Sequence, residues 1–190
     1  MLKELPEFAA DYHAELIEFI ANGEADYAFR TGITGSRSLM VSVQPNTGTS
    51  WTGRFVGEDA FRGGMSGLFG TPSSQHLCVV ERGSAFLVNV QNPPTSLVIS
   101  SNGPIRQVYP MVEFDALLLV TSWTVMALGQ GAMRWRTPRL AIEGIRLDDV
   151  VDNHLVGIAD PDDDEPREFE IDLRTGIATL DPEYNADSTR

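Results

Sequence analysis

The sequence is almost without cysteine and without long apolar runs. Cys78 is the single cysteine of the 190 residues, so the chain cannot form an intramolecular disulfide, and this usage favours a reducing compartment. The longest strongly apolar run, Ala116–Val120, is far shorter than the ~20 residues that span a bilayer. The N-terminus carries acidic residues where a secretory signal would carry basic ones. We therefore expect a cytoplasmic protein.

Motifs of the common enzyme classes are also missing. The sequence contains no Gly-x-x-x-x-Gly-Lys phosphate loop, no Gly-x-Gly-x-x-Gly after a predicted strand, no Gly-x-Ser-x-Gly elbow and no His-Glu-x-x-His pair. Its three histidines, His13, His76 and His154, are scattered along the chain. We predict no catalytic residue, no cofactor and no metal ligand; these absences favour a protein that is not an enzyme, and an enzyme whose site is built from residues far apart in the sequence stays open as an alternative.

Basic residues are scarce, and the acidic ones are unevenly distributed. The net charge is −13, of which residues 143–190 hold −11, with 15 acidic residues and 4 arginines. Nucleic acids and anionic membranes bind through basic groups, so neither is an expected partner. A basic protein partner is expected instead, attracted by electrostatic steering. The alternative interpretation is that the acidity serves solubility alone.

The pattern after residue 24 is that of a mainly β domain. Short runs rich in Val, Ile, Leu, Phe and Trp alternate with turns that contain Gly, Pro or Asn, such as Arg82-Gly83 and Arg174-Thr175-Gly176. We predict an antiparallel meander of hairpins over residues 24–180, blade-like or sandwich-like, followed by a flexible tail over 181–190. The thirteen predicted strands are Leu39–Gln44, Trp51–Val56, Leu77–Glu81, Ala85–Gln91, Leu97–Ser100, Ile105–Met111, Ala116–Trp123, Val125–Leu128, Met133–Arg136, Ile145–Val150, His154–Ala159, Phe169–Leu173 and Ile177–Leu180.

The first segment, residues 1–23, is predicted to form an amphipathic helix packed on the same domain. From Pro6 to Ile20 the apolar residues recur at intervals of three and four, as on one helical face. Pro6 suits a first helical turn, and Gly23 suits a C-terminal stop.

Part of the β region resembles the repeated units of a β-propeller. The rhythm of an inner strand, a hairpin turn and an outer strand recurs at about the spacing of propeller blades. It rests on the segments Gly83–Val88, Gly131–Arg136 and Arg167–Asp172, which run into Pro93, Pro138 and Gly176. About three such units cannot close a ring of 4–8 blades. The alternatives are an open meander, a sandwich, or two chains that complete each other.

The loop from Asp160 to Pro166 concentrates carboxylates between two prolines. Asp160, Asp162 and Asp164 copy the start of a calcium loop, but Glu165 stands in place of the required glycine and Ile171 in place of the final glutamate. We interpret the segment as an exposed hairpin loop. Asp162, Asp163, Asp164 and Glu165 are the predicted partner-binding residues.

A second candidate site lies near the glycine-rich segment Ala60–Gln75, which we predict to be irregular and folded over one end of the core. Arg54 and His76 are its predicted ligand-binding residues. His76 and Cys78 share one face of a strand, which is the beginning of a cysteine nucleophile, but a buried strand is the preferred interpretation. In Arg134-Trp135-Arg136 we expect a core tryptophan and two arginines that form internal salt bridges.

Three functional hypotheses remain open. The first is a non-enzymatic interaction module, such as an inhibitor or immunity-type protein that presents its acidic loops to a basic partner. The second is an enzyme or small-molecule-binding protein with a site under residues 60–75. The third is an auxiliary β domain of a homo-oligomer, with a homodimer as the simplest form.

Overall fold

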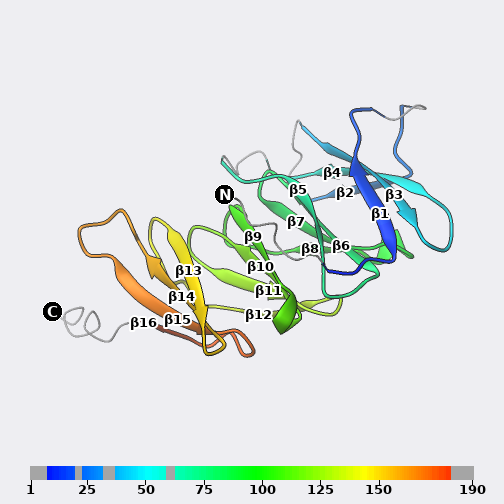
Figure 1. Cartoon of the computed structure of the whole chain (residues 1–190). Helices are drawn as coiled ribbons and strands as arrows, with labels where there is room; N and C mark the ends of the chain where they lie inside the picture. Colours follow the sequence, from blue (N-terminus) through cyan, green and yellow to red (C-terminus); the bar gives the residue numbers. More distant parts are fainter. Residues whose placement is uncertain (1–7, 20–22, 32–36, 59–62, 181–190) are drawn as a thin grey trace, which may run out of the picture.

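The computed structural model describes residues 8–19, 23–31, 37–58 and 63–180, and within them the chain is mainly β. Sixteen strands form four sheets of four strands each (Figure 1). The first sheet contains β1 (Tyr12–Leu16), β2 (Tyr27–Arg30), β3 (Leu39–Pro45) and β4 (Trp51–Val56); the second contains β5 (Gly67–Gly70), β6 (His76–Glu81), β7 (Ser84–Asn89) and β8 (Leu97–Ile99). The third contains β9 (Gln107–Met111), β10 (Ala116–Val120), β11 (Val125–Leu128) and β12 (Met133–Arg136); the fourth contains β13 (Ile145–Val151), β14 (His154–Ala159), β15 (Arg167–Asp172) and β16 (Ala178–Leu180).

The last three sheets are antiparallel meanders in which each strand pairs with the next one along the chain. The first sheet differs, with the order β1-β3-β4-β2, and its β2 runs parallel to β4. Tight turns set the register of the hairpins. Arg82 and Gly83 both have positive φ between β6 and β7, and Asp152 and Asn153 do the same between β13 and β14, as two-residue hairpin turns require.

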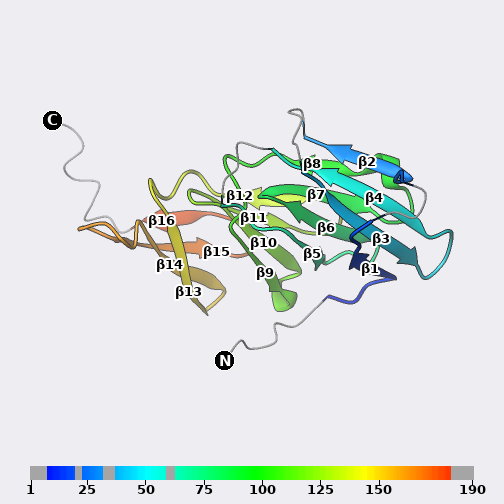
Figure 2. The same cartoon turned by 90° about the horizontal axis from the view of Figure 1, so that it is seen from above.

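The four sheets are stacked face to face in chain order (Figures 1 and 2). Three buried clusters fill the spaces between them, and strand alternation decides which side chains enter each. Leu77 and Val79 of β6 face the first sheet, whereas Cys78 and Val80 face the third. The two middle sheets are therefore buried on both faces, while within the described ranges the first and fourth sheets each bury one.

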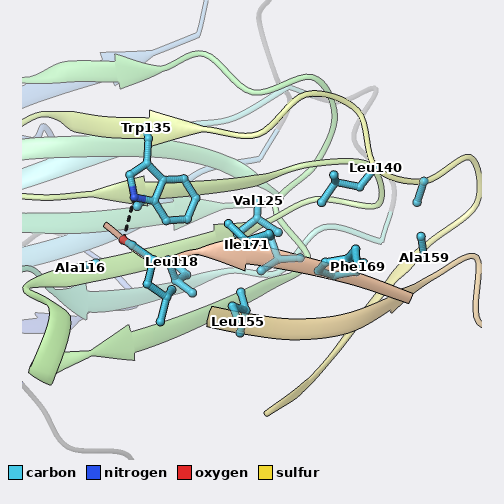
Figure 3. Close-up of a cluster of buried hydrophobic side chains, with 13 residues drawn as sticks. Ala116, Leu118, Val125, Trp135, Leu140, Leu155, Ala159, Phe169 and Ile171 are labelled. Carbon is cyan, nitrogen blue, oxygen red and sulfur yellow. Dashed lines mark hydrogen bonds between the residues drawn. The ribbon is translucent and has the colours of Figure 1, made fainter. Parts of the chain in front are cut away.

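The cluster between the third and fourth sheets shows how the stack is held (Figure 3). Leu118 of β10 and Phe169 of β15 are both buried in it, together with Trp135 of β12. The Trp135 indole N–H donates a hydrogen bond to the backbone carbonyl of Leu173, with an N–O distance of 3.0 Å, so its one polar atom is satisfied inside the core.

All thirteen predicted strands are present, with end shifts of a few residues, and the two short 3-10 helices, η1 (Pro93–Thr95) and η2 (Val112–Phe114), lie in connections. Three strands were not predicted: β1, β2 and β5.

The predicted N-terminal helix is wrong. No helix of seven or more residues occurs in the described part of the chain, and Tyr12–Leu16 is strand β1, paired with β3. The physical reason is that Tyr12 and Ala14 also fit the two-residue period of a strand, and both pack against the cluster between the first two sheets. The Tyr12 hydroxyl donates to the His76 carbonyl at 2.9 Å, which ties β1 to the second sheet.

Part of the segment predicted to be irregular is also strand. β5 lies within Ala60–Gln75 and is an edge strand of the second sheet, paired with β6, so Leu68 and Phe69 enter the core clusters on opposite faces of that sheet and this part of the segment does not fold over one end of the core. Residues 59–62 and the predicted tail 181–190 lie outside the described residues.

Candidate interaction surface

The outer face of the fourth sheet carries exposed acidic side chains together with one cation, Arg146, which lies opposite Ile158. Phe169 and Ile171 of β15 point into the core, so Glu168 and Glu170 point outward and are exposed. On the neighbouring strand β14, Ile158 lies opposite Glu168 and Val156 lies opposite Glu170. We call this the acidic face, and its members are Asp148, Val156, Ile158, Glu168 and Glu170.

A shallow hollow of about 540 Å³ lies on the acidic face. Val156 and Ile158 give it an apolar floor, and carboxylates of β13 and β15 stand around that floor. Asp148 is paired with Arg146, with an N–O distance of 2.8 Å, but both side chains are about half exposed. Among the described residues, neither Glu168 nor Glu170 has an ion-pair partner, so their charges are available to a partner.

The loop beside this face is anchored by Asp160. Its carboxylate accepts hydrogen bonds from the backbone N–H groups of Ile142, Glu143 and Gly144 at 2.7, 2.6 and 3.4 Å. The same carboxylate pairs with the Arg167 guanidinium at 2.7 Å. Burial raises the pKa of Asp160, but these four donors outweigh burial and leave the pKa below its usual value. Asp160 therefore has a structural role and is not free to ligate a metal.

The predicted partner-binding residues Asp162, Asp163, Asp164 and Glu165 are exposed at the tip of this loop. Among the described residues, no group of three or more His, Cys, Asp or Glu side chains is arranged to hold a metal ion. The loop tip thus presents four carboxylates next to the acidic face, with Arg146 as a neighbouring cation that interacts with Asp162.

Arg54 and His76, the predicted ligand-binding pair, are not brought together. Arg54 lies on β4 and points away from the second sheet, where its Nε donates to the Ser38 hydroxyl at 3.2 Å. His76 begins β6 and points to the opposite side of that sheet, where its ring lies against Gly131. Its Nδ1 is 2.9 Å from the Ser73 hydroxyl oxygen, and burial lowers the pKa of the imidazole.

Cys78 is a core residue. Its side chain has no exposed surface, and burial raises the pKa of the thiol to about 12. The residue packs between the second and third sheets, which supports the buried-strand interpretation over a cysteine nucleophile.

The Arg134-Trp135-Arg136 segment matches its prediction in part. Trp135 is in the core as expected. The arginines do not pair with acidic residues within the described chain. Arg134 donates to the Phe114 carbonyl at 2.8 Å, and Arg136 donates to the Ser100 carbonyl. Backbone carbonyls of η2 and of the residue after β8 therefore take the place of the expected carboxylates.

The sequence contained a signal for the acidic face that we did not use. Glu168, Glu170 and Asp172 alternate with Phe169 and Ile171, which is the pattern of a strand with one carboxylate-bearing face. The four consecutive acids of the neighbouring loop, Asp162–Glu165, are a more conspicuous acidic signal than the alternating acids of β15.

Comparisons with known proteins add little. No protein-family model and no curated protein matches the chain. One solved structure, "Dihydro-heme d1 dehydrogenase NirN in complex with DHE", is similar over 94% of this chain, which spans 45% of the length of that structure, with 14% identity and a TM-score of 0.44. A likeness at this level transfers neither chemistry nor fold. No helix within the described ranges is long and apolar enough to cross a membrane.

Proposed function

We propose that this protein is a non-enzymatic interaction module that binds a basic protein surface through the acidic face and the adjoining loop Asp162–Glu165. The observation that carries the proposal is the pair of unpaired carboxylates, Glu168 and Glu170, beside an apolar floor. A cytoplasmic inhibitor or immunity-type protein is one form that such a module takes.

The arrangement suits arginine and lysine side chains. Both have an aliphatic stem that packs on apolar surface and a charged end that seeks a carboxylate. Val156 and Ile158 would contact the stems, and Glu168 and Glu170 would bind the charged ends. Successive outward residues of a strand are about 7 Å apart, so two basic groups with this spacing would be bound together.

We also infer that the four sheets are blade-like units. Three of them are four-stranded meanders joined directly to the next, and each meets its neighbours through one buried layer. This is the construction of propeller blades. Among the described sheets, the acidic face lies at one end of the row.

The test uses a fluorescein-labelled nona-arginine peptide, whose binding is followed by fluorescence anisotropy at several salt concentrations. The double variant Glu168→Gln/Glu170→Gln removes two charges from the acidic face. We expect its affinity to fall about tenfold, or about 1.4 kcal/mol. Reversal of the loop charges at Asp162–Glu165 is expected to weaken binding further and to reduce its salt dependence.

The matched control is Glu113→Gln/Asp115→Asn, which removes two charges from the exposed η2 turn of the third sheet. Asp115 has φ of 51°, a conformation that asparagine also tolerates. We expect the control to change the affinity less than about twofold. Equal weakening in both double variants would mean that the peptide senses only net charge, and it would refute the proposed surface.

A further inference from the structure

We propose that a hollow between the first two sheets binds a neutral, polyhydroxylated ligand of the sugar class. The hollow has a volume of about 320 Å³ and lies where the β3–β4 connection meets the segment after β7. Its walls include Tyr27 and Trp51 of the first sheet, Asp26 directly before β2, and Gln91 after β7. The hollow is separate from the acidic face, which belongs to the fourth sheet, so this site goes beyond the proposed function.

Asp26 provides a fixed hydrogen-bond acceptor at the rim of the hollow. Its Oδ2 accepts hydrogen bonds from the backbone N–H and the hydroxyl of Thr52, at 2.7 and 2.9 Å. The bond from the Thr52 backbone N–H is the main reason that the pKa of Asp26 lies below its usual value, so the group is ionised at neutral pH. Oδ1 has no hydrogen-bond partner on another described residue, so a ligand hydroxyl that donated to it would form a charge-assisted hydrogen bond.

The other polar groups of the hollow are neutral. The hydroxyls of Tyr27, Thr49 and Ser50 form no hydrogen bond with any described residue, so each can both donate to a ligand and accept from it. Gln91 adds a carboxamide from the second sheet, and its Nε2 lies 3.4 Å from the Thr47 hydroxyl oxygen. Sugar hydroxyls are themselves donors and acceptors, so they suit this mixed set.

Aromatic rings and prolines give the hollow an apolar wall. The rings of Tyr27 and Trp51 meet edge to face, with their centroids 5.5 Å apart and an angle of 90° between their planes. The Trp51 indole N–H donates to the Val90 carbonyl at 3.0 Å, which ties this wall to the second sheet. Pro45 and Pro93 extend the apolar lining. The C–H groups on the faces of a sugar ring can pack on such a wall while its hydroxyls reach the polar groups.

The lining disfavours other ligand classes. No Lys, Arg or His occurs among the described residues of the hollow, so phosphates and carboxylates find no opposite charge there. A quaternary ammonium ion needs open aromatic faces, but only 6% of Trp51 is exposed. A neutral ligand with several hydroxyls matches one carboxylate, three hydroxyls and one carboxamide.

The test follows the indole N–H signals of the three tryptophans in proton–nitrogen correlation spectra of the full chain. The probes are the methyl α-pyranosides of D-glucose, D-galactose and D-mannose, together with N-acetyl-D-glucosamine. Each is added to about 50 mM, because a small polar ligand on an open site is expected to bind with a Kd of about 1 mM or weaker. We expect at least one probe to shift the Trp51 signal. Trp123 and Trp135 belong to the third sheet, and their signals should not move.

The decisive variant is Asp26→Asn. Asparagine can still accept both hydrogen bonds from Thr52 through its one side-chain oxygen, but its amide N–H group takes the place of the free acceptor. We expect the affinity for the bound probe to fall at least about fivefold. The matched control is Asp172→Asn on β15, where the carboxylate likewise accepts backbone N–H groups, those of Arg174 and Thr175, at 2.8 Å. This control should leave the affinity unchanged.

A second variant, Thr49→Val/Ser50→Ala, leaves the bonds between Asp26 and Thr52 intact. It removes two hydroxyls from exposed positions, so the fold is expected to persist, and the affinity should fall at least about threefold. Circular dichroism and thermal unfolding confirm that each variant folds.

The sugar site would be refuted if no probe at about 50 mM moved the Trp51 signal. Equal affinity in the wild-type chain and in both variants would mean that the probe binds elsewhere, and it would also overturn the assignment. Tetramethylammonium chloride is the competing probe. If it shifted the Trp51 signal while no sugar did, the hollow would be a cation site instead.

Discussion

The carboxylate of Asp160 and the guanidinium of Arg167 are paired at 2.7 Å where the β14–β15 hairpin leaves the sheet, with only 3% and 18% of their side chains exposed. The same carboxylate accepts three backbone N–H groups of residues 142–144. That segment leads from the third sheet into the fourth, so one side chain fixes both the connection between two sheets and the base of the acidic loop.

The first prediction concerns the substitution Asp160→Asn. Asparagine keeps the shape of the side chain and tolerates the φ of 56° found here. It lacks the negative charge to which the Arg167 guanidinium and the three backbone N–H groups donate. We expect the free energy of unfolding to fall by about 2–3 kcal/mol, because a shielded ion pair loses one partner. Urea unfolding followed by circular dichroism measures it. The control Asp162→Asn changes an exposed carboxylate of the same loop and is expected to cost less than about 0.5 kcal/mol.

The second prediction concerns pH. The pKa of Asp160 is below its usual value in the folded chain, so unfolded chains bind its proton more readily. Its stabilisation is complete above the unfolded pKa of about 4 and is lost as the pH falls through the folded pKa. The difference in unfolding free energy between wild type and Asp160→Asn should therefore be constant at neutral pH and shrink below about pH 4. A difference that stays constant down to pH 2.5 would contradict this assignment.

The third prediction compares two glycines with similar backbone conformations. Gly83 has φ of 84°, and a Cβ atom there would lie 2.5 Å from Cβ of Pro104. Gly23 has φ of 78°, with no described atom within 4 Å of such a Cβ. Gly23→Ala carries only backbone strain, about 1 kcal/mol. Gly83→Ala adds a clash with a neighbouring backbone and is expected to cost at least about 3 kcal/mol in thermal or urea unfolding. Equal costs would show that the contact with Pro104 relaxes freely.

The fourth prediction concerns the thiol of Cys78. Because the side chain is fully buried and its pKa is raised to about 12, the native protein should not react with a disulfide reagent at pH 8 within minutes. The same chain should react with one equivalent once unfolded in guanidinium chloride. Fast labelling of the native protein would show that β6 separates readily from the third sheet.

The fold was predictable where strand patterns stand alone. Val125–Leu128 and Met133–Arg136 match β11 and β12 because a turn with two glycines, Gly129 and Gly131, separates the two strands. The N-terminal helix failed because the spacing from Pro6 to Ile20 fits two periods, and pairing with β3, which is far along the chain, selects the strand. β5 was hidden by the glycines at both its ends, which usually indicate a loop.

The sequence predicted the acidic loop of the candidate surface but not the acidic face beside it. The consecutive acids Asp162–Glu165 could be found from the sequence because their exposure follows from their number and from the flanking prolines. Whether Arg54 and His76 meet depends on which sheet each strand joins and on which face each points to. Only the order in which the sheets stack gives this information, and in that order Arg54 and His76 point to different sides of the second sheet.

The packing of the four sheets in a row also affects how the molecule opens. The three core clusters join each sheet only to its neighbours, so the protein is a one-dimensional array, and such arrays lose structure from their termini inward. Amide protons of β10 and β11 are then the slowest to exchange with solvent, and those of the first and fourth sheets are the fastest. The acidic face therefore lies on one of the least stable units, and a ligand held there would slow opening throughout that end of the array.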